Sequence, residues 1–356
     1  MEKNMSTKSY KKMVTVLMPV YNGEKYLAES INSILNQTFI DFELIIINDG
    51  STDNSEQIIK SYLDSRIVYI RNINNLRLIR TLNKGIALSK GKYIARMDCD
   101  DVSDITRLAY QLQYMESNLE IGVLGTAIKI IDGDGNKKGT LVMPVQDGMI
   151  RWNMNFGCPF AHPTVMMRKD ALEALSTAKS GEYYSLDAYQ SEDYDLWYRM
   201  SKITKLHNLK QPLLMLRKHG LNESIVNGKA VNQKSLSIIK EIIYEATTKM
   251  TPDESLSCLG NQSEPKSSEE AIFLLGILRD LFENIQKKSY DKGVLRVIKR
   301  DYIRRIIQAS QNYFLNKQIK HKILKIYLED PFYAFAYSIL VTFRKAWHEN
   351  FGKKNE

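Results

Sequence analysis

The sequence has little cysteine and no long hydrophobic run. Its cysteines, Cys99, Cys158 and Cys258, lie far apart and form no C-x-x-C pair. The sequence therefore predicts neither a disulfide framework nor a thiolate metal site, and it favours a reducing compartment. No stretch reaches the roughly 18 uncharged apolar residues that a membrane-spanning helix needs. The first apolar run, MVTVLMPVY, lacks a signal-peptide cleavage site, so we expect a cytoplasmic protein.

Positive charge is concentrated in one part of the chain. The formal net charge of the 356 residues is +9, and residues 286–327 alone hold twelve Lys and Arg against two Asp. The remainder is therefore close to neutral. The sequence carries no recognised nucleic-acid motif, and a charge run is usually a solvated face. We therefore expect no nucleic-acid partner, and a non-catalytic basic nucleic-acid-binding protein is an alternative only.

The basic segment also has an amphipathic pattern. Arg300 and Arg304 lie opposite an apolar stripe, which is formed by Leu295, Ile298, Tyr302 and Ile306. Residues 331–343, PFYAFAYSILVTF, are uncharged and aromatic-rich but too short to span a bilayer. Residues 286–345 either bind an anionic membrane surface, on the inner face of the cytoplasmic membrane, or form a helical subdomain with a solvated basic face.

Up to about residue 125, short apolar runs alternate with helical patterns. Strands are expected at 14–20, 42–49, 66–72 and 92–98, and helices at 24–37, 56–63 and 80–90. The continuous run LIII indicates a strand that is buried on both faces, as in a parallel sheet covered by helices. The first third of the chain is therefore predicted to be an open α/β unit.

The pattern loosens after this unit. IKIIDGDGNKKGTLVM indicates a hairpin, HPTVMMRKDALEAL a strand that enters a helix, and KLHNLKQPLLMLRKHG two more strands. Ser191 is expected to cap the helix of SEDYDLWYRMSK, whose first turn is acidic. From about Val231 onward the pattern is mostly helical. We expect a basic leader at 1–12, an α/β domain at 13–228 and a basic helical region at 229–356.

Polar clusters follow three of the predicted strands: PVYNG, NDGSTD and DCDD. Ligands of open parallel sheets bind beyond the carboxyl ends of the strands, so the clusters predict a nucleotide-sized crevice. The D-x-D of Asp98 and Asp100 suits a hard divalent cation such as Mn²⁺ or Mg²⁺. Asp49 can accept a hydrogen bond from a base. The alternatives are an acidic turn that caps a helix near Asp104 and a simple strand-to-helix turn at NDGSTD.

Five stretches in this order resemble the family 2 glycosyltransferases, which have the GT-A fold. They are the segment from VTVLMPVYNG to NDGSTDNS, then KGKYIARMDCDD, HPTVMMRK, SEDYDLWYRM and LRKHGLNES, and the similarity covers about residues 13–225. The resemblance implies an open, mostly parallel sheet flanked by helices. Residues 13–125 would form the nucleotide-sugar half and residues 126–228 the acceptor half, before the mainly helical region.

The resemblance also implies roles at the strand ends. Tyr21, next to Pro19 in PVYN, and Asp49 would contact the uracil of a UDP-sugar. Asp98 would face the ribose or a metal-bound water and help to hold the cation. Asp100 would be the direct metal ligand.

Further roles fall on later motifs. Asp193 of SEDYD matches the general-base position, with Glu192 beside it. Arg217 and His219 of LRKHG would lie near the diphosphate of the donor, and Asn83 also matches a donor-binding position. For His162, a role in the scaffold is expected.

One segment departs from the family pattern. Leu76, Arg77 and Leu78 stand where many relatives carry a glycine. We therefore expect the loop over the donor to be shaped differently.

Together these observations predict an inverting, metal-dependent glycosyltransferase. Transfer in line at the anomeric carbon needs a base for the acceptor hydroxyl and positive charge at the departing diphosphate. We expect a UDP-sugar to donate a hexose or N-acetylhexosamine to a glycan, with a lipid-linked acceptor in surface polysaccharide synthesis. The alternative is a Mg²⁺-dependent phosphoryl or nucleotidyl transfer enzyme. Its phosphatase form usually has an aspartate after the first strand, where this chain has PVYNG.

Overall fold

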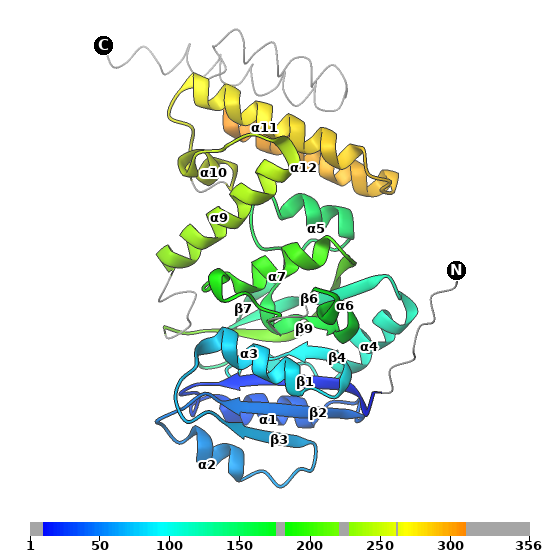
Figure 1. Ribbon diagram of the computed structural model, residues 1–356, viewed down its shortest axis with the longest axis vertical. Coiled ribbons are helices and arrows are strands. Elements are labelled where there is room, and N and C mark those ends of the chain that lie inside the picture. Colours follow the sequence, from blue (N-terminus) through cyan, green and yellow to red (C-terminus); the bar gives the residue numbers. More distant parts are fainter. Residues whose placement is uncertain (1–9, 176–181, 221–227, 261–262, 311–356) are drawn as a thin grey trace. The chain divides into compact units, whose positions relative to one another are not determined.

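The computed structural model describes residues 10–175, 182–220, 228–260 and 263–310. The contacts divide the chain into two units, Met1–Ile239 and Lys240–Glu356. The first holds the sheet and the second holds helices (Figure 1). Helix α9 (Gly228–Thr247) crosses the division between them.

The first unit begins with the predicted alternation of strands and helices. Its elements are β1 (Lys12–Val20), α1 (Leu27–Leu35), β2 (Phe42–Asn48), α2 (Ser55–Lys60), β3 (Ile67–Arg71), α3 (Arg77–Leu88) and β4 (Gly91–Arg96). The four strands pair in parallel in the order β3-β2-β1-β4. Every residue of β2 is buried, which confirms the inference drawn from its run of β-branched residues.

The rest of the first unit adds five strands to the same sheet, of which β6 and β9 pair in parallel and the others pair antiparallel with their neighbours. Its elements are β5 (Val102–Ser103), α4 (Arg107–Ser117), β6 (Ile121–Asp132), β7 (Lys137–Leu141), α5 (Asp147–Asn153), β8 (Met166–Arg168), α6 (Lys169–Leu175), α7 (Glu192–Ser201) and β9 (Lys205–Lys218). Strand β8 pairs antiparallel with both β4 and β6. The nine-stranded sheet has the order β3-β2-β1-β4-β8-β6-β9-β5, with β7 paired to β6. The hairpin β6–β7 was predicted.

One expectation for this region is wrong. The sequence predicted two strands across KLHNLKQPLLMLRKHG, and the structure has the single long strand β9. Its register against β6 shifts, since Thr126 pairs with Leu209 and Ala127 with Pro212. The extra residues of β9 form a bulge next to Pro212, which has no N–H for the ladder. The strand therefore continues past the proline.

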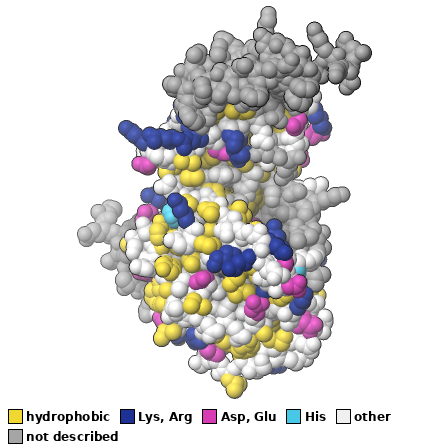
Figure 2. Space-filling model, turned by 180° about the vertical axis from the view of Figure 1, so that it is seen from behind, with side chains coloured by type: hydrophobic (Ala, Val, Ile, Leu, Met, Phe, Trp, Pro, Cys, Tyr) yellow, Lys and Arg dark blue, Asp and Glu magenta, His cyan; other side chains and the backbone are white. Residues whose placement is uncertain are grey.

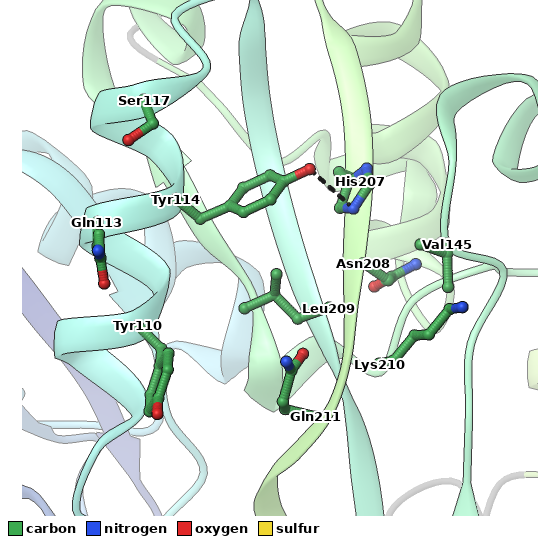
Figure 3. Close-up of a pocket in the computed structure, with 10 residues that line it drawn as sticks. All are labelled: Tyr110, Gln113, Tyr114, Ser117, Val145, His207, Asn208, Leu209, Lys210 and Gln211. Atoms are coloured by element: carbon green, nitrogen blue, oxygen red, sulfur yellow. Dashed lines mark hydrogen bonds between the residues drawn. The ribbon is translucent and has the colours of Figure 1, made fainter.

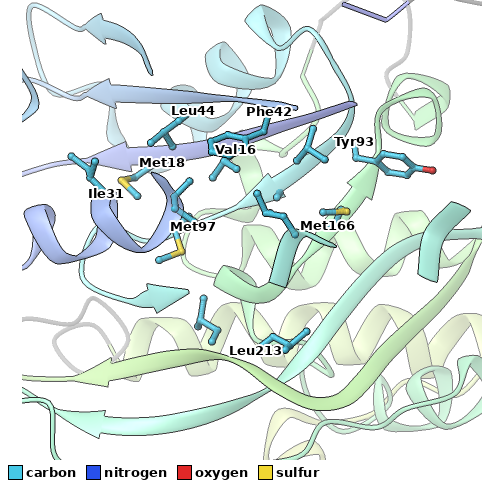
Figure 4. Packing of buried hydrophobic residues seen from close by; sticks show 14 of the residues in the cluster. Val16, Met18, Ile31, Phe42, Leu44, Tyr93, Met97, Met166 and Leu213 are labelled. Atoms are coloured by element: carbon cyan, nitrogen blue, oxygen red, sulfur yellow. The ribbon is translucent and has the colours of Figure 1, made fainter. Parts of the chain in front are cut away.

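The core of the first unit lies between the sheet and the helices on its two faces. Ile31 of α1 packs with Val16 and Met18 of β1 in the main hydrophobic cluster (Figure 4). Leu17 points to the opposite face of β1, where a Cβ on Gly85 of α3 would lie 2.2 Å from its Cδ1. Only a glycine lets α3 approach the sheet so closely. The two faces are thus covered by different helices.

The second unit is built of helices, as predicted. They are α10 (Asp253–Leu259), α11 (Ser268–Gln286) and α12 (Lys292–Ser310), after the end of α9. The predicted stripe of α12 is buried at Ile298, Tyr302 and Ile306, and the Tyr302 ring stacks on Phe282 of α11 at 4.3 Å. Arg300 and Arg304 are exposed, as the amphipathic pattern predicted. The apolar face of α12 therefore packs against helices of the same unit.

The predicted membrane-binding segment is only partly covered by the structure. Residues 311–345 of it, including the aromatic-rich run 331–343, lie outside the described residues. Within the described ranges, no helix is long and apolar enough to cross a membrane. On the face seen in Figure 2, hydrophobic, basic and acidic side chains of the described residues are intermixed.

Candidate active site

The polar clusters after β1 and β2 form one connected structure. The backbone N–H of Asn22 donates to Ser51 Oγ at 3.0 Å, and the N–H of Thr52 donates back to Asn22 Oδ1 at 2.8 Å. Because β1, β2 and β4 are parallel, their carboxyl ends share one edge of the sheet. Pro19 is buried in β1, and Tyr21 beyond it is 51% exposed at this edge.

Asp49 is held rigidly at the end of β2. It is 4% exposed, and its Oδ1 accepts hydrogen bonds from Asn72 Nδ2 at 2.7 Å and from the Leu76 N–H at 2.9 Å. Gly50 has φ +74°, and a Cβ there would lie 2.8 Å from the backbone nitrogen of Asn75. A glycine is required at this turn. The turn aims Asp49 into the loop that follows β3.

The loop after β3 contains the departure from the family pattern. Arg77 has φ +68°, a left-handed conformation that a glycine would adopt more readily. Its guanidinium lies over the ring of Tyr189, 5.4 Å from the centroid. The loop after β3 is therefore bordered by a stacked arginine and tyrosine.

The three carboxylates of DCDD gather directly after β4. Oxygen atoms of Asp98, Asp100 and Asp101 lie within 4.8 Å of one another. Asp98 and Asp100 are partly exposed, whereas Asp101 is buried and its Oδ1 accepts the Arg217 N–H at 2.8 Å. Burial and its two acidic neighbours raise the pKa of Asp101 well above its ordinary value. Two accessible carboxylates with oxygen donors suit Mn²⁺ or Mg²⁺, so this donor set fits such an ion.

An acidic turn that caps a helix near Asp104 was the alternative for these carboxylates. Asp104 Oδ1 accepts the Thr106 N–H at 3.0 Å and the Thr106 hydroxyl at 2.6 Å, in the turn directly before α4. Thr106 stands at the N-cap position of α4, and its side chain makes no capping hydrogen bond. Asp104 therefore closes the turn that precedes the helix.

The end of β9 is tied to the acidic cluster. His219 Nε2 lies 2.9 Å from Asp100 Oδ2. Arg217 is 2% exposed; its Nε donates to Asp100 O at 2.9 Å, and its Nη2 donates to Glu29 Oε2 at 2.5 Å. Its guanidinium also lies 4.4 Å from the ring centroid of Tyr26. The structure thus brings both predicted residues to the cluster, with Arg217 as a buried support of the turn.

Asp193 lies in the first turn of α7. Its Oδ1 accepts the Tyr194 N–H at 2.7 Å, and its Oδ2 lies 3.8 Å from Cys158 Sγ. Burial raises the pKa of Asp193, while the positive charge of Arg96 acts in the opposite direction. Burial also raises the pKa of the Cys158 thiol far above its usual value, so the thiol keeps its proton and donates to the Asp193 carboxylate. A carboxylate in such surroundings is a stronger base than one in water.

The prediction that the Ser191 side chain caps α7 is wrong. Ser191 stands at the N-cap position, but its side chain makes no capping hydrogen bond. The hydroxyl instead donates to Gln190 O at 2.7 Å and lies 2.9 Å from Ser235 Oγ. Gln190 has φ +75°, and this turn directs the hydroxyl away from the helix.

Asn83 and His162 both contact Tyr184. Asn83 Nδ2 donates to Tyr184 O at 2.8 Å, and its Oδ1 accepts the Tyr184 N–H at 2.8 Å. His162 Nε2 lies 2.9 Å from the Tyr184 hydroxyl, and burial lowers the pKa of His162 well below its ordinary value. These contacts hold the segment before α7 against α3. They place Asn83 in a supporting position, and its donor contact stays a prediction.

Sequence reasoning missed Arg96 at the end of β4. It is 3% exposed and forms an ion pair with Asp98. The signal was present, because a single charge interrupts the otherwise apolar run YIARM. Charged residues are almost never buried without a partner.

A separate cavity of about 440 Å³ lies between α4 and β9 (Figure 3). Tyr114 and His207 line it, with the Tyr114 hydroxyl 3.0 Å from His207 Nε2. None of the predicted site residues lines this cavity. The predicted site is instead the edge formed by the ends of β1, β2 and β4.

The mixed sheet with its acidic edge has the GT-A fold that the sequence predicted. The UDP complex of Staphylococcus aureus TarS residues 1–349 has a similar fold, with a TM-score of 0.53 at 16% identity, over 88% of this chain and 89% of that one. Residues 15–176 match the sequence profile of glycosyl transferase family 2.

Two relatives are similar over most of their length. An uncharacterized glycosyltransferase of Haemophilus influenzae is 31% identical over 336 residues, which are 88% of this chain and 98% of the relative. The O-antigen biosynthesis glycosyltransferase WbnJ of Escherichia coli is 36% identical over 69% of this chain and 94% of its own. The chain belongs to glycosyl transferase family 2, as its motifs indicated.

Proposed function

We propose that this glycosyltransferase moves a hexose or N-acetylhexosamine from a UDP-sugar to a glycan hydroxyl in a single displacement with inversion. The observation that carries the proposal is the cluster of three carboxylates within 4.8 Å at the edge that also holds Tyr21 and Asp49. A related solved structure, TarS, was determined with UDP and with UDP-GlcNAc. The O-antigen role of the relative WbnJ supports polysaccharide synthesis.

Different side chains have separate roles in the proposed transfer. The exposed ring of Tyr21 offers a face on which uracil can stack, next to the rigid Pro19. Asp49 uses one oxygen for the protein and keeps the other for the base N–H. Asp98 and Asp100 would hold Mn²⁺ or Mg²⁺, which supplies positive charge for the departing diphosphate.

The proton of the acceptor goes to Asp193. Its half-buried carboxylate is more basic than one in water, so it is suited to take a proton from a sugar hydroxyl as the new bond forms. Arg217 and His219 support the turn of Asp100 beside the diphosphate. Asn83 and His162 both contact Tyr184, and these contacts hold the segment that leads to Asp193.

The nucleotide assignment is tested by calorimetry and by a donor panel. With saturating Mn²⁺, UDP is expected to bind with measurable heat, and CDP and GDP at least about tenfold more weakly, because cytosine has no N3–H for Asp49 to accept and guanine is a larger purine. A UDP-sugar should be the one hydrolysed when a panel of nucleotide-sugars is incubated with Mn²⁺. Equal binding of all nucleotides would contradict the role of Asp49, and absence of UDP binding would overturn the proposal.

The acceptor is proposed to be lipid-linked and to be met at an anionic membrane surface. In this proposal, residues 13–228 catalyse the transfer and residues 229–356 bind the membrane surface. Exposed arginines of α12 supply charge, since each Lys or Arg near such a surface contributes about 1 kcal/mol.

The membrane proposal is tested by flotation with vesicles. The variant R296Q/R300Q/R304Q should float with phosphatidylglycerol vesicles at least about tenfold less than the wild type, because it lacks three of these charges. The control R66Q/R71Q, on the sheet unit, should float normally. Equal flotation of both variants would contradict the proposal.

A further inference from the structure

The two carboxylates proposed to hold the cation already face basic side chains of the protein. Arg96 forms an ion pair with Asp98, and His219 Nε2 lies 2.9 Å from Asp100 Oδ2. Arg96 carries its charge at every relevant pH, because a guanidinium does not lose its proton in proteins. The guanidinium of Arg96 therefore balances one carboxylate charge of the cluster from within the chain.

The side chain of Arg96 is buried but incompletely bonded. Its Nε has no hydrogen-bond partner among the described residues, and its Nη1 meets Asp98 without an aligned hydrogen bond. The main chain is fixed, since Arg96 N donates to Val165 O at 2.9 Å and Arg96 O accepts from Arg107 Nη2 at 2.8 Å. A buried guanidinium with an unused donor calls for an explanation. The backbone of Arg96 is therefore held by hydrogen bonds, whereas its guanidinium lacks some of the hydrogen bonds that it could make.

The charge of Arg96 also acts on the proposed base. It acts to lower the pKa of Asp193, which lies on α7, and that of His162, which lies before β8. One buried cation therefore pairs with Asp98 and also influences the proposed base.

We propose that Arg96 is an internal counter-ion that competes with the divalent cation for Asp98. This inference rests on the proposed function. In the nucleotide-free protein the guanidinium occupies Asp98 and keeps cation affinity low. When a nucleoside diphosphate sugar enters, Asp98 exchanges Arg96 for the cation, and the released guanidinium faces the negative donor. Cation and donor then promote each other's binding, and this coupling is reciprocal. Arg96 is a positioning residue in this scheme.

The test is a titration of nucleotide-free protein with Mn²⁺, with free Mn²⁺ measured by electron paramagnetic resonance. R96Q is expected to bind Mn²⁺ about tenfold more tightly than the wild type, because one positive charge near the ligands is removed. R96K keeps a charge on a shorter side chain, so it should bind about threefold more tightly. The control R305Q changes another buried arginine, which pairs with Asp301 at 2.7 Å in the second unit, and should match the wild type.

A second titration, in saturating UDP, measures the coupling. The factor by which UDP raises Mn²⁺ affinity should be smaller in R96Q than in the wild type. Wild-type Mn²⁺ affinity in both R96Q and R96K, with folded proteins by circular dichroism, would overturn the counter-ion role and leave the proposed function standing. If no protein binds Mn²⁺ even with UDP, both this inference and the metal site of the proposed function are wrong.

Discussion

Replacing Asp193 with asparagine is expected to lower kcat about 10³-fold while the affinity for UDP stays unchanged, because a general base contributes about 10²- to 10⁴-fold to such a transfer. The amide keeps the shape of the side chain and can still accept the Tyr194 N–H bond. It cannot take a proton from the acceptor hydroxyl. The measurement is a steady-state rate with the donor identified in the panel, together with UDP calorimetry.

The matched control is Asp195, two residues further along α7. Its carboxylate pairs with Arg199 at 2.7 Å on the helix surface. Asp195→Asn should therefore retain activity within about twofold, because this partly exposed pair contributes on the order of 1 kcal/mol to stability and Asp195 has no proposed role in transfer. If Asp193→Asn kept full turnover, the base would have to be another residue.

The pH dependence of the wild type follows from the same carboxylate. Burial raises the pKa of Asp193 above the ordinary value of an aspartate, and only the ionised form acts as a base. Activity should therefore fall as the pH drops through this raised pKa, at a higher pH than for an ordinary carboxylate with a pKa of about 3.9. A rate profile that falls only at the ordinary aspartate pKa would contradict the assignment.

The stability of the protein should fall as the pH rises, whereas the activity should rise. The folded-state pKa of Asp193 lies above the unfolded one. Its contribution to the free energy of unfolding is therefore fully present below the unfolded pKa and is lost as the pH rises through the folded pKa. An asparagine does not ionise, so Asp193→Asn does not lose stability in this way. The variant should thus be at least as stable as the wild type at neutral pH, although it is inactive. Thermal unfolding at pH 7 measures this.

The ordered parts of the fold were predictable because they repeat a local pattern. In β2 every residue is apolar or buried, and in α1 the apolar residues recur at the helical period. These patterns reflect local backbone geometry, so a single sequence is enough to locate the strands and helices. The parallel arrangement then places Asp49 and Asp98 at one edge. That edge could be predicted without knowledge of any side-chain contact.

What the sequence did not predict depends on contacts between distant residues. The segment KLHNLKQPLLMLRKHG was predicted to form two strands, but a register shift against β6 at Pro212 lets one strand continue. Ser191 has the residue type of a cap, but its hydroxyl is used by Gln190 O and Ser235. Asn83 matched a motif, yet its amide holds the backbone of Tyr184, 101 residues away in sequence. A motif therefore indicates the residue type, and only the fold shows its partner.

The metal-binding role proposed for Asp100 leads to the second large effect. Asp100→Asn is expected to lower turnover about 10³-fold, because the charge that a bound cation gives to a leaving group is worth several kcal/mol. Unlike Asp193→Asn, this variant should also lose the Mn²⁺-dependent part of UDP binding. In the wild type EDTA should weaken UDP binding, and in Asp100→Asn EDTA should have no further effect. Calorimetry in Mn²⁺ and in EDTA distinguishes the two variants.

Asp101→Asn supplies the control for this experiment, since it makes the same change at the next residue. Burial and the neighbouring Asp98 and Asp100 raise the pKa of Asp101, so its carboxylate is protonated more easily than that of an ordinary aspartate. The asparagine oxygen can still accept the Arg217 N–H that Asp101 Oδ1 accepts at 2.8 Å. Asp101→Asn should therefore keep its Mn²⁺-dependent binding of UDP. Equal losses in both variants would show that charge anywhere in the cluster is sufficient, and that Asp100 is not the specific ligand.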